Sequence, residues 1–190
     1  MDHLLPNEKE FVEKALVSLD EFVPLYKFYQ KKIFNYCLHR LPTEVDAEDT
    51  TSQVFVNALN SFANKQYVSS DEYTFKAWLF RIAHNLIVDF YRGKSRYKII
   101  EIDENIVEDE ATCQEIEETL DLERSSNKIL AILKRFDDST QSIFVLRFRE
   151  DMNFEEIAQV ISLDLSTTKM KYYRALNLIK KIIEKEKFIN

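Results

Sequence analysis

The sequence predicts an all-α protein made of two small helical domains, residues 1–98 and 128–190, joined by an acidic linker. The first observation behind this prediction is glycine: the chain has one in 190 residues, where average composition gives roughly thirteen. Apolar residues also recur at helical spacing along most of the chain, with only three prolines to interrupt helices. The third observation is a run of acidic residues at 99–127, which is typical of a solvated linker.

The same composition excludes several classes of function. A phosphate-binding loop needs at least two glycines and a dinucleotide-binding fingerprint needs three, and Gly93 alone can supply neither. Cys37 and Cys113 form no CxxC pair and the histidines show no metal-ligand spacing, so we expect no cofactor and no metal site. Because neither a signal peptide nor a membrane-length apolar run is visible, we expect a cytoplasmic protein without membrane insertion.

The first domain begins with two predicted helices. Asn7 and Glu10 resemble a capping box, in which two side chains satisfy free amides at a helix start, and apolar residues continue at helical spacing to Phe22. Pro24 suits the first turn of the second helix. That helix is predicted to end just before Pro42, because a residue that precedes proline avoids the α region.

Two further helices complete the first domain. Thr43 or Asp46 starts the third helix, which carries an apolar face and is followed by a polar loop over residues 64–73. The fourth helix runs from about Thr74 and ends in a basic tail over residues 92–96. No alternation typical of β-strands is visible, so the domain is predicted to be a helical bundle.

The second domain is predicted to hold four helices after the linker. The first carries the apolar residues between 129 and 136, and the second follows Asp138 or Ser139 as a cap. Asn153 starts the third helix with the spacing of a capping box. Ser166 starts the last and longest helix.

Charge is strongly segregated along the chain. The net charge is −7, yet residues 99–127 alone carry eleven acidic and one basic residue, which leaves 25 basic and 22 acidic residues elsewhere. A flexible tether is the usual explanation of such acidity, and a basic target for the acidic segment is the more specific one. The sequence leaves these two alternatives open.

Residues 153–177 have the pattern of a helix-turn-helix. In this motif the second helix enters the major groove, and its first residues meet base edges. From Ser166 onward the chain carries seven basic and two acidic residues, which suits contact with phosphates. An ordinary helical pair with a solvated, charged face would give a similar pattern.

Two segments of the first domain form further candidate surfaces. The helix over residues 75–92 mixes aromatic and basic side chains, and unstacked bases bind to aromatic rings beside a basic track. Most of its aromatic residues also fit a buried stripe, whereas Asn85 and the basic residues are less easily explained by packing. Asp46, Glu48 and Asp49 precede an apolar helix face: the helix dipole accounts for one or two of them, and all three could form a docking face for a basic partner.

These three segments, in this order, resemble the extracytoplasmic-function sigma factors of bacterial RNA polymerase. The likeness is carried by DAEDTTSQVFVNAL, FKAWLFRIAHNLIVDFYR and NFEEIAQVISLDLSTTKMKYYRAL. The resemblance implies that residues 1–98 form the family's region 2 and residues 128–190 its region 4. The family's linker runs toward the polymerase active centre, so the acidic residues 99–127 would occupy a channel built for RNA.

The resemblance also implies a promoter-specificity subunit that is not an enzyme. Docking on the clamp helices of core polymerase is implied for Asp46, Glu48, Asp49 and Gln53. Contact with the minus-ten element is implied for Lys76, Trp78, Arg81, Asn85, Asp89 and Arg92. Contact with the minus-thirty-five element is implied for Ser166, Thr167, Lys169, Lys171, Tyr173 and Arg174.

The implied partners are core RNA polymerase, through its clamp helices and flap, promoter DNA and an anti-sigma factor, with no small-molecule substrate. The alternative is a stand-alone helix-turn-helix regulator, which would need neither the acidic segment nor the aromatic and basic helix. The chain departs from the family pattern at Ser162, Ser166, Met170, Tyr172, Tyr173 and His84. The departures after residue 165 bear on which minus-thirty-five sequence is read, because base readout depends on a few side chains.

Overall fold

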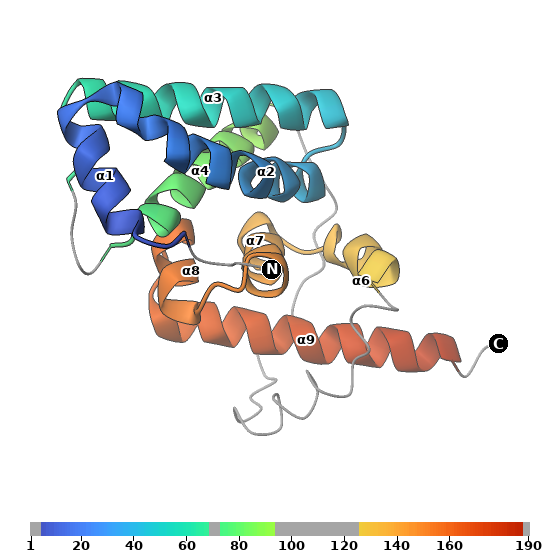
Figure 1. Ribbon diagram of the computed structural model, residues 1–190. Helices are drawn as coiled ribbons and strands as arrows, with labels where there is room; N and C mark the ends of the chain where they lie inside the picture. The colour runs from blue at the N-terminus through green and yellow to red at the C-terminus, as the bar shows by residue number, and fades with distance from the viewer. Residues whose placement is uncertain (1–4, 69–72, 94–125, 188–190) are drawn as a thin grey trace.

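The computed structural model describes residues 5–68, 73–93 and 126–187, and every regular element in these ranges is helical (Figure 1). The elements are α1 (Glu8–Val17), the 3-10 turn η1 (Leu19–Phe22), α2 (Val23–Arg40), α3 (Glu44–Ala63), α4 (Phe75–Gly93), α6 (Ser126–Leu133), α7 (Asp138–Arg149), α8 (Phe154–Ile161) and α9 (Leu165–Lys187). The predicted all-α class is confirmed. The predicted acidic linker lies outside the described residues except for its last two positions, and Cys113 lies outside them as well.

The start of the chain differs from its prediction in two ways. Asn7 adopts the left-handed region with φ of 59° and its side chain makes no capping hydrogen bond, so the capping box predicted with Glu10 is absent. A cap of that kind needs extended backbone at the capping residue. The first helix is also shorter than predicted, because extended backbone at Ser18 ends α1 and η1 then carries Phe22 into the core.

The next helix boundaries follow the predicted signals. α2 ends at Arg40, directly before Leu41 and Pro42. Thr43 rather than Asp46 caps α3: its hydroxyl oxygen accepts a hydrogen bond of 3.1 Å from the backbone amide of Asp46. The hydroxyl oxygen of Thr74 likewise accepts from the amide of Ala77 at 3.1 Å, where α4 begins.

In the second half of the chain, one predicted cap is confirmed, and two helices start one residue earlier than predicted. Asn153 forms its capping box at the start of α8, through hydrogen bonds of 2.8 and 3.0 Å with Glu156. The cap of α7 is Asp137 instead of the predicted Asp138 or Ser139. α9 begins at Leu165, one residue before the predicted Ser166.

An aromatic cluster holds η1, the end of α3 and the start of α4 together. The rings of Phe22, Phe62, Tyr67, Phe75 and Trp78 meet with centroids between 4.6 and 6.1 Å apart. Each such pair contributes about 0.5–1.5 kcal/mol beyond the burial of its area. Tyr172 plays the corresponding part in the second half, where its fully buried ring packs between α7 and α8.

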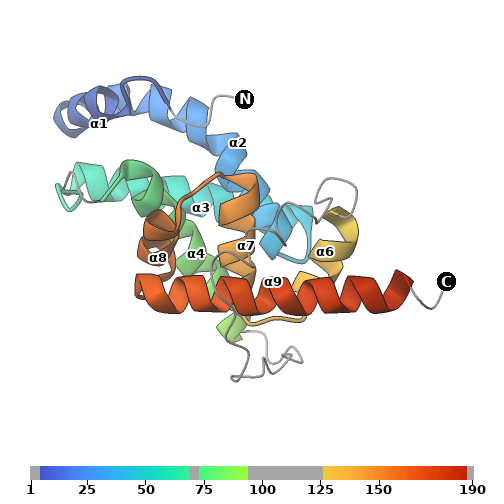
Figure 2. The same ribbon diagram turned by 90° about the horizontal axis from the view of Figure 1, so that it is seen from below.

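The two halves lie directly against each other. α4 packs on α8 and α2 packs on α7, while α9 runs along the side of α7 and α8 that faces away from α2 and α3 (Figures 1 and 2). The described residues thus present the outer faces of α3, α4 and α9 on different sides of one compact molecule. None of the described helices is both long enough and apolar enough to cross a bilayer.

Candidate nucleic-acid and polymerase interfaces

The first turns of α3 present an acidic face. Asp46, Asp49 and Gln53 follow one another at spacings of three and four residues, which places them on one side of the helix. Asp49 and Gln53 are exposed, and Asp46 is half-buried with its carboxylate accepting a hydrogen bond of 2.6 Å from Thr43. Glu48 is also exposed, but its position two residues after Asp46 puts it on the flank of this face.

One face of α4 gathers five of the six residues predicted to contact the minus-ten element. They follow at spacings of three and four residues and are all exposed or half-buried: Trp78, Arg81, Asn85, Asp89 and Arg92. The indole of Trp78 packs edge to face against the ring of Tyr67, with ring centroids 4.6 Å apart and an interplanar angle of 69°. The guanidinium of Arg81 lies 5.0 Å from the ring centroid of Tyr73, at the end of the loop that precedes α4. The start of this face thus combines an aromatic ring and a cation, and its other end carries Asn85, Asp89 and Arg92.

Lys76, the sixth residue, lies elsewhere. It is 3% exposed, and its ammonium donates a hydrogen bond of 2.7 Å to the backbone carbonyl of Glu150, which follows α7. Burial lowers the pKa of Lys76, while the charges of Glu156 and Glu150 oppose that shift. In this arrangement Lys76 is a contact between the two halves of the chain, on the side of α4 away from Trp78 and Arg81.

The first turns of α9 present a mixed polar and basic face. Ser166 is exposed, and the other candidates for the minus-thirty-five element are half-buried: Thr167, Lys169, Lys171, Tyr173 and Arg174. The opposite side of the helix anchors it through the buried residues Thr168, Tyr172, Ala175, Leu176 and Ile179. α9 is thus fixed by one face and leaves the other accessible.

The turn between α8 and α9 explains how the start of α9 is held. Ser162 adopts the left-handed region with φ of 57°, a conformation that costs less for glycine and is taken here by serine. Asp164 then caps α9, because its carboxylate accepts hydrogen bonds of 2.7 and 2.6 Å from the amide and hydroxyl of Thr167. Thr167 therefore belongs to the cap as well as to the candidate surface.

Two residues that the sequence reasoning missed shape this face. Asp137 lies 3.2 Å from the ammonium of Lys171; burial opposes its charge, but hydrogen bonds from Ser139 and Thr140 and the lysine lower its pKa to about 2. The ring of Phe154 has the guanidinium of Arg147 at 5.2 Å and the ammonium of Lys169 at 5.9 Å from its centroid. Asp137 is of a residue type that caps helices, as are the predicted caps Asp138 and Ser139 beside it, so the residue type alone does not single it out.

The comparisons with known proteins agree with this geometry. Residues 25–97 match the family model for sigma-70 region 2. The chain is 30% identical over 168 residues to the RNA polymerase sigma factor YlaC of Bacillus subtilis (strain 168), which covers 88% of this chain and 95% of YlaC. It is also 30% identical over 176 residues to the ECF RNA polymerase sigma factor BldN of Streptomyces coelicolor (strain ATCC BAA-471 / A3(2) / M145), covering 92% of this chain and 65% of BldN.

Among solved structures, CnrH in complex with the cytosolic domain of CnrY matches with a TM-score of 0.67 and 19% sequence identity, over 93% of this chain and 97% of CnrH. That likeness concerns the fold alone. The match to YlaC, which covers 95% of that protein, and the region 2 match establish the relationship in sequence. The chain therefore belongs to the extracytoplasmic-function sigma factors of the sigma-70 family.

Proposed function

We propose that this sigma factor binds core RNA polymerase, recognises minus-thirty-five and minus-ten promoter elements and starts transcription of a specific set of genes. One observation carries the proposal: three separate accessible faces, on the start of α3, on α4 and on the start of α9, each hold one of the predicted residue sets almost complete. A sigma factor acts where chromosome and polymerase meet, so we place it in the cytoplasm. The sigma factor supplies promoter specificity, and the polymerase forms the phosphodiester bonds of the transcript.

We assign residues 1–98 to region 2 and residues 128–190 to region 4. The region 2 match over residues 25–97 supports the first assignment. The tight turn at Ser162 between the capped helices α8 and α9 supports the second, because it is the geometry of a helix-turn-helix.

Core binding is assigned to the acidic face of α3. Exposed carboxylates are complementary in charge to a basic surface, and such complementarity steers association and selects the partner. Asp49 is the central residue of this face because Asp46 and Gln53 lie one turn to either side of it. Glu48 lies on the flank of this face and is assigned a contact at the edge of the core-binding surface. Binding to the flap of the polymerase is assigned to region 4.

Promoter melting is assigned to the outer face of α4. Unpairing a base costs a few kcal/mol, and a protein lowers this cost by holding bases that have already left the stack. Trp78 offers a ring for stacking, and Arg81, one turn further along the helix, supplies positive charge beside it. Arg92 supplies positive charge at the far end of α4, where it pairs with Asp89 at 3.3 Å. Asn85 is exposed at the centre of this face and offers both a donor and an acceptor for a base edge.

Reading of the minus-thirty-five element is assigned to the first turns of α9. The side chains near the N-terminus of a recognition helix reach base edges in the major groove. Ser166 and Thr167 are short polar groups at this end, and Lys169, Lys171 and Arg174 supply cations for phosphates or guanine edges. Tyr173 extends the same accessible surface.

We also propose a protein partner that regulates this chain, an anti-sigma factor. The support is the solved structure of CnrH, which holds the cytosolic domain of a second protein, CnrY. The stand-alone regulator is the second candidate function. It leaves the acidic face of α3 and the aromatic and basic face of α4 without a role, so the sigma reading is favoured.

A transcription assay tests the proposed function. Purified core polymerase, this protein and a library of genomic fragments are combined, and new transcript starts are mapped. We expect a stable complex with core and a set of starts that share two spaced elements. Specific binding to duplex DNA without core, together with no complex and no new start, would support the stand-alone regulator and contradict the sigma reading.

A further inference from the structure

The proposed recognition helix α9 carries an exposed methionine among polar and basic neighbours. Met170 is the sixth residue of the helix, and 41% of its surface is exposed. It lies two residues before Tyr172 and five before Ala175, spacings that place it on the side of the helix opposite these two buried residues. α9 itself runs along the outside of α7 and α8 (Figures 1 and 2). The Met170 side chain therefore projects away from the helices on which α9 packs.

Met170 occupies the centre of the face that we assign to the minus-thirty-five element. Ser166 lies one turn before it, and Tyr173 and Arg174 lie one turn after it, so all four side chains share one side of α9. Ser166 is exposed, and the two later residues are half-buried. Because Met170 lies within the first two turns, it belongs to the part of a recognition helix that reaches base edges in the major groove.

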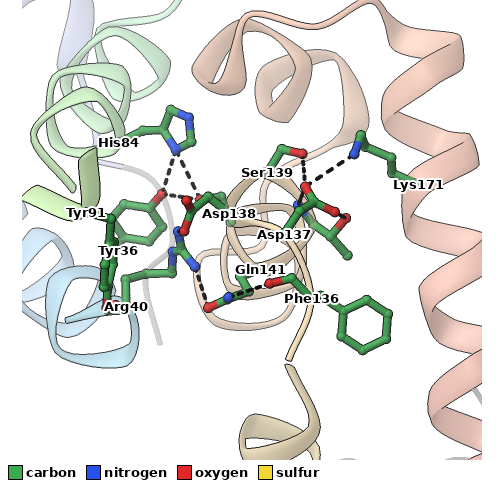
Figure 3. A network of polar contacts seen from close by, with 12 residues as sticks. Tyr36, Arg40, His84, Tyr91, Phe136, Asp137, Asp138, Ser139, Gln141 and Lys171 are labelled. Carbon is green, nitrogen blue, oxygen red and sulfur yellow. Dashed lines mark hydrogen bonds and ion pairs between the residues drawn. The ribbon is translucent and has the colours of Figure 1, made fainter. Parts of the chain in front are cut away.

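The two lysines beside Met170 are held toward other elements. The ammonium of Lys169 lies 5.9 Å from the centroid of the Phe154 ring, at the start of α8. The ammonium of Lys171 lies 3.2 Å from the carboxylate of Asp137, which caps α7 (Figure 3). Both cations are thus placed on the flanks of the face, where contacts with phosphates would position the helix. The centre of the face is left to Met170.

The chemistry of the thioether restricts which base edge it can favour. A methionine side chain has no hydrogen-bond donor, and its sulfur is a weak acceptor. The major-groove edges of guanine, adenine and cytosine present donors and acceptors, which lose their hydrogen bonds to water without replacement when an apolar side chain covers them. Thymine alone presents a methyl group in the groove. Contact between Met170 and this methyl group would bury apolar surface on both partners.

Met170 is not needed to anchor α9. The core side of the helix is formed by Tyr172, Leu176 and Ile179, each fully buried. A single exposed apolar side chain is ordinary on a protein surface, so what distinguishes Met170 is its position at the centre of a face assigned to bases. Substitutions at exposed positions change stability little. Position 170 can therefore be varied while the fold is kept.

We propose that Met170 reads the methyl group of one thymine in the minus-thirty-five element, so that this sigma factor prefers a T·A base pair at that position. The inference rests on the proposed function and names one base pair that region 4 selects. Its three rotatable bonds let the side chain follow a methyl group in the groove. Phosphate contacts strengthen binding to every sequence alike, whereas the contact of Met170 with a methyl group discriminates between sequences.

Removal of a single methyl group from the DNA tests the proposal. A promoter found in the transcription screen is prepared with each thymine of its minus-thirty-five element, on either strand, replaced in turn by deoxyuridine. This change keeps the base pair and removes only the methyl group. The apparent affinity of the holoenzyme for each DNA is measured with the wild type, Met170→Gln and Met170→Leu. Val17→Gln is the control, because Val17 is a 90% exposed apolar residue at the end of α1, away from α9 (Figure 1).

We expect the wild type to bind about three- to fourfold more weakly when one particular thymine loses its methyl group, which is the effect of exposing one buried methyl group. Met170→Gln should lose this difference, while Met170→Leu and Val17→Gln should retain it. Equal affinity of the wild type for all substituted promoters, or a difference that persists in Met170→Gln, would overturn the role of Met170. A minus-thirty-five element without a T·A base pair would overturn it as well. Failure of every variant to form a holoenzyme that binds promoter DNA would instead contradict the proposed function.

Discussion

The carboxylate of Asp137 lies 3.2 Å from the ammonium of Lys171, so the residue that caps α7 also contacts the proposed recognition helix α9 (Figure 3). The same carboxylate accepts hydrogen bonds of 3.1 and 2.6 Å from the amide and hydroxyl of Thr140, and another from Ser139. One acidic side chain thus fixes the start of α7 and the direction of a lysine assigned to DNA.

The cap and the ion pair should differ in what they contribute to stability. Asp137→Ala removes the cap of α7 and should lower the free energy of unfolding by about 1–2 kcal/mol. Lys171→Ala removes only a partly exposed ion pair and should lower it by less than about 0.5 kcal/mol. Chemical denaturation of both variants measures the two effects. Equal losses would mean that the ion pair, and not the cap, holds α7.

Glu150 should make stability depend on pH near neutrality. Burial raises the pKa of this carboxyl to about 7 from 4.5, against the opposing charges of Lys32 and Lys76. The folded protein therefore favours the protonated form, and this stabilisation is present below pH 4.5 and lost as pH rises through 7. Glu150→Gln should remove this loss of stability at high pH. Its free energy of unfolding should exceed that of the wild type by on the order of 2 kcal/mol at pH 8.

Thermal unfolding of the wild type and Glu150→Gln at pH 5 and pH 8 checks this sign. The difference in Tm between the two proteins should be small at pH 5 and large at pH 8. A Glu150→Gln variant that is less stable than the wild type at pH 8 would mean instead that Glu150 is held as a carboxylate by Lys32 and Lys76.

Core binding and promoter use should separate by mutation. Asp49→Arg reverses charge at the centre of the acidic face of α3 and should weaken binding to core by tenfold or more, because like charges then meet. Lys171→Ala should leave core binding unchanged and reduce transcription from promoters that depend on the minus-thirty-five element. Binding to labelled core and run-off transcription measure the two steps, and the reverse pattern would exchange the roles of α3 and α9.

Asn85 should act in melting without contributing to the fold. It is exposed on the outer face of α4, so Asn85→Ala should change the free energy of unfolding by less than about 0.5 kcal/mol. The loss of a hydrogen-bonding side chain beside the flipped bases should slow open-complex formation by about tenfold. Asn60→Ala, an exposed asparagine of α3, is the matched control and should leave that rate unchanged.

Local signals predicted most of the helix boundaries. Thr43, Thr74 and Asn153 cap the helices that follow them because each side-chain oxygen accepts from the backbone amide three residues ahead, so no distant contact is needed. The prediction that Asn7 caps α1 was wrong because the backbone of Asn7 is left-handed, and the spacing of residue types does not reveal this conformation. Asp137 was missed because three adjacent residues can all cap a helix.

The contacts between the two halves of the chain could not be predicted from the sequence. Tyr36 and Ser142 are 106 positions apart, and neither carries a local sign that the other is its partner. Lys76 illustrates the same limit: in the sequence it is one of several cations on an aromatic helix, and only the packing of α8 on α4 distinguishes it from Arg81. The three outer faces were predictable, because each depends on spacing along one helix.

Promoter melting by the holoenzyme is the most direct test of the sigma-factor account. A promoter found in the transcription screen is treated with permanganate, which oxidises unpaired thymines, in the presence of core polymerase, this protein or both. We predict reactive thymines at the minus-ten element only when core and protein are both present, and their loss with Asp49→Arg. Reactivity that appears with this protein alone, or no reactivity with the complete mixture, would contradict the account.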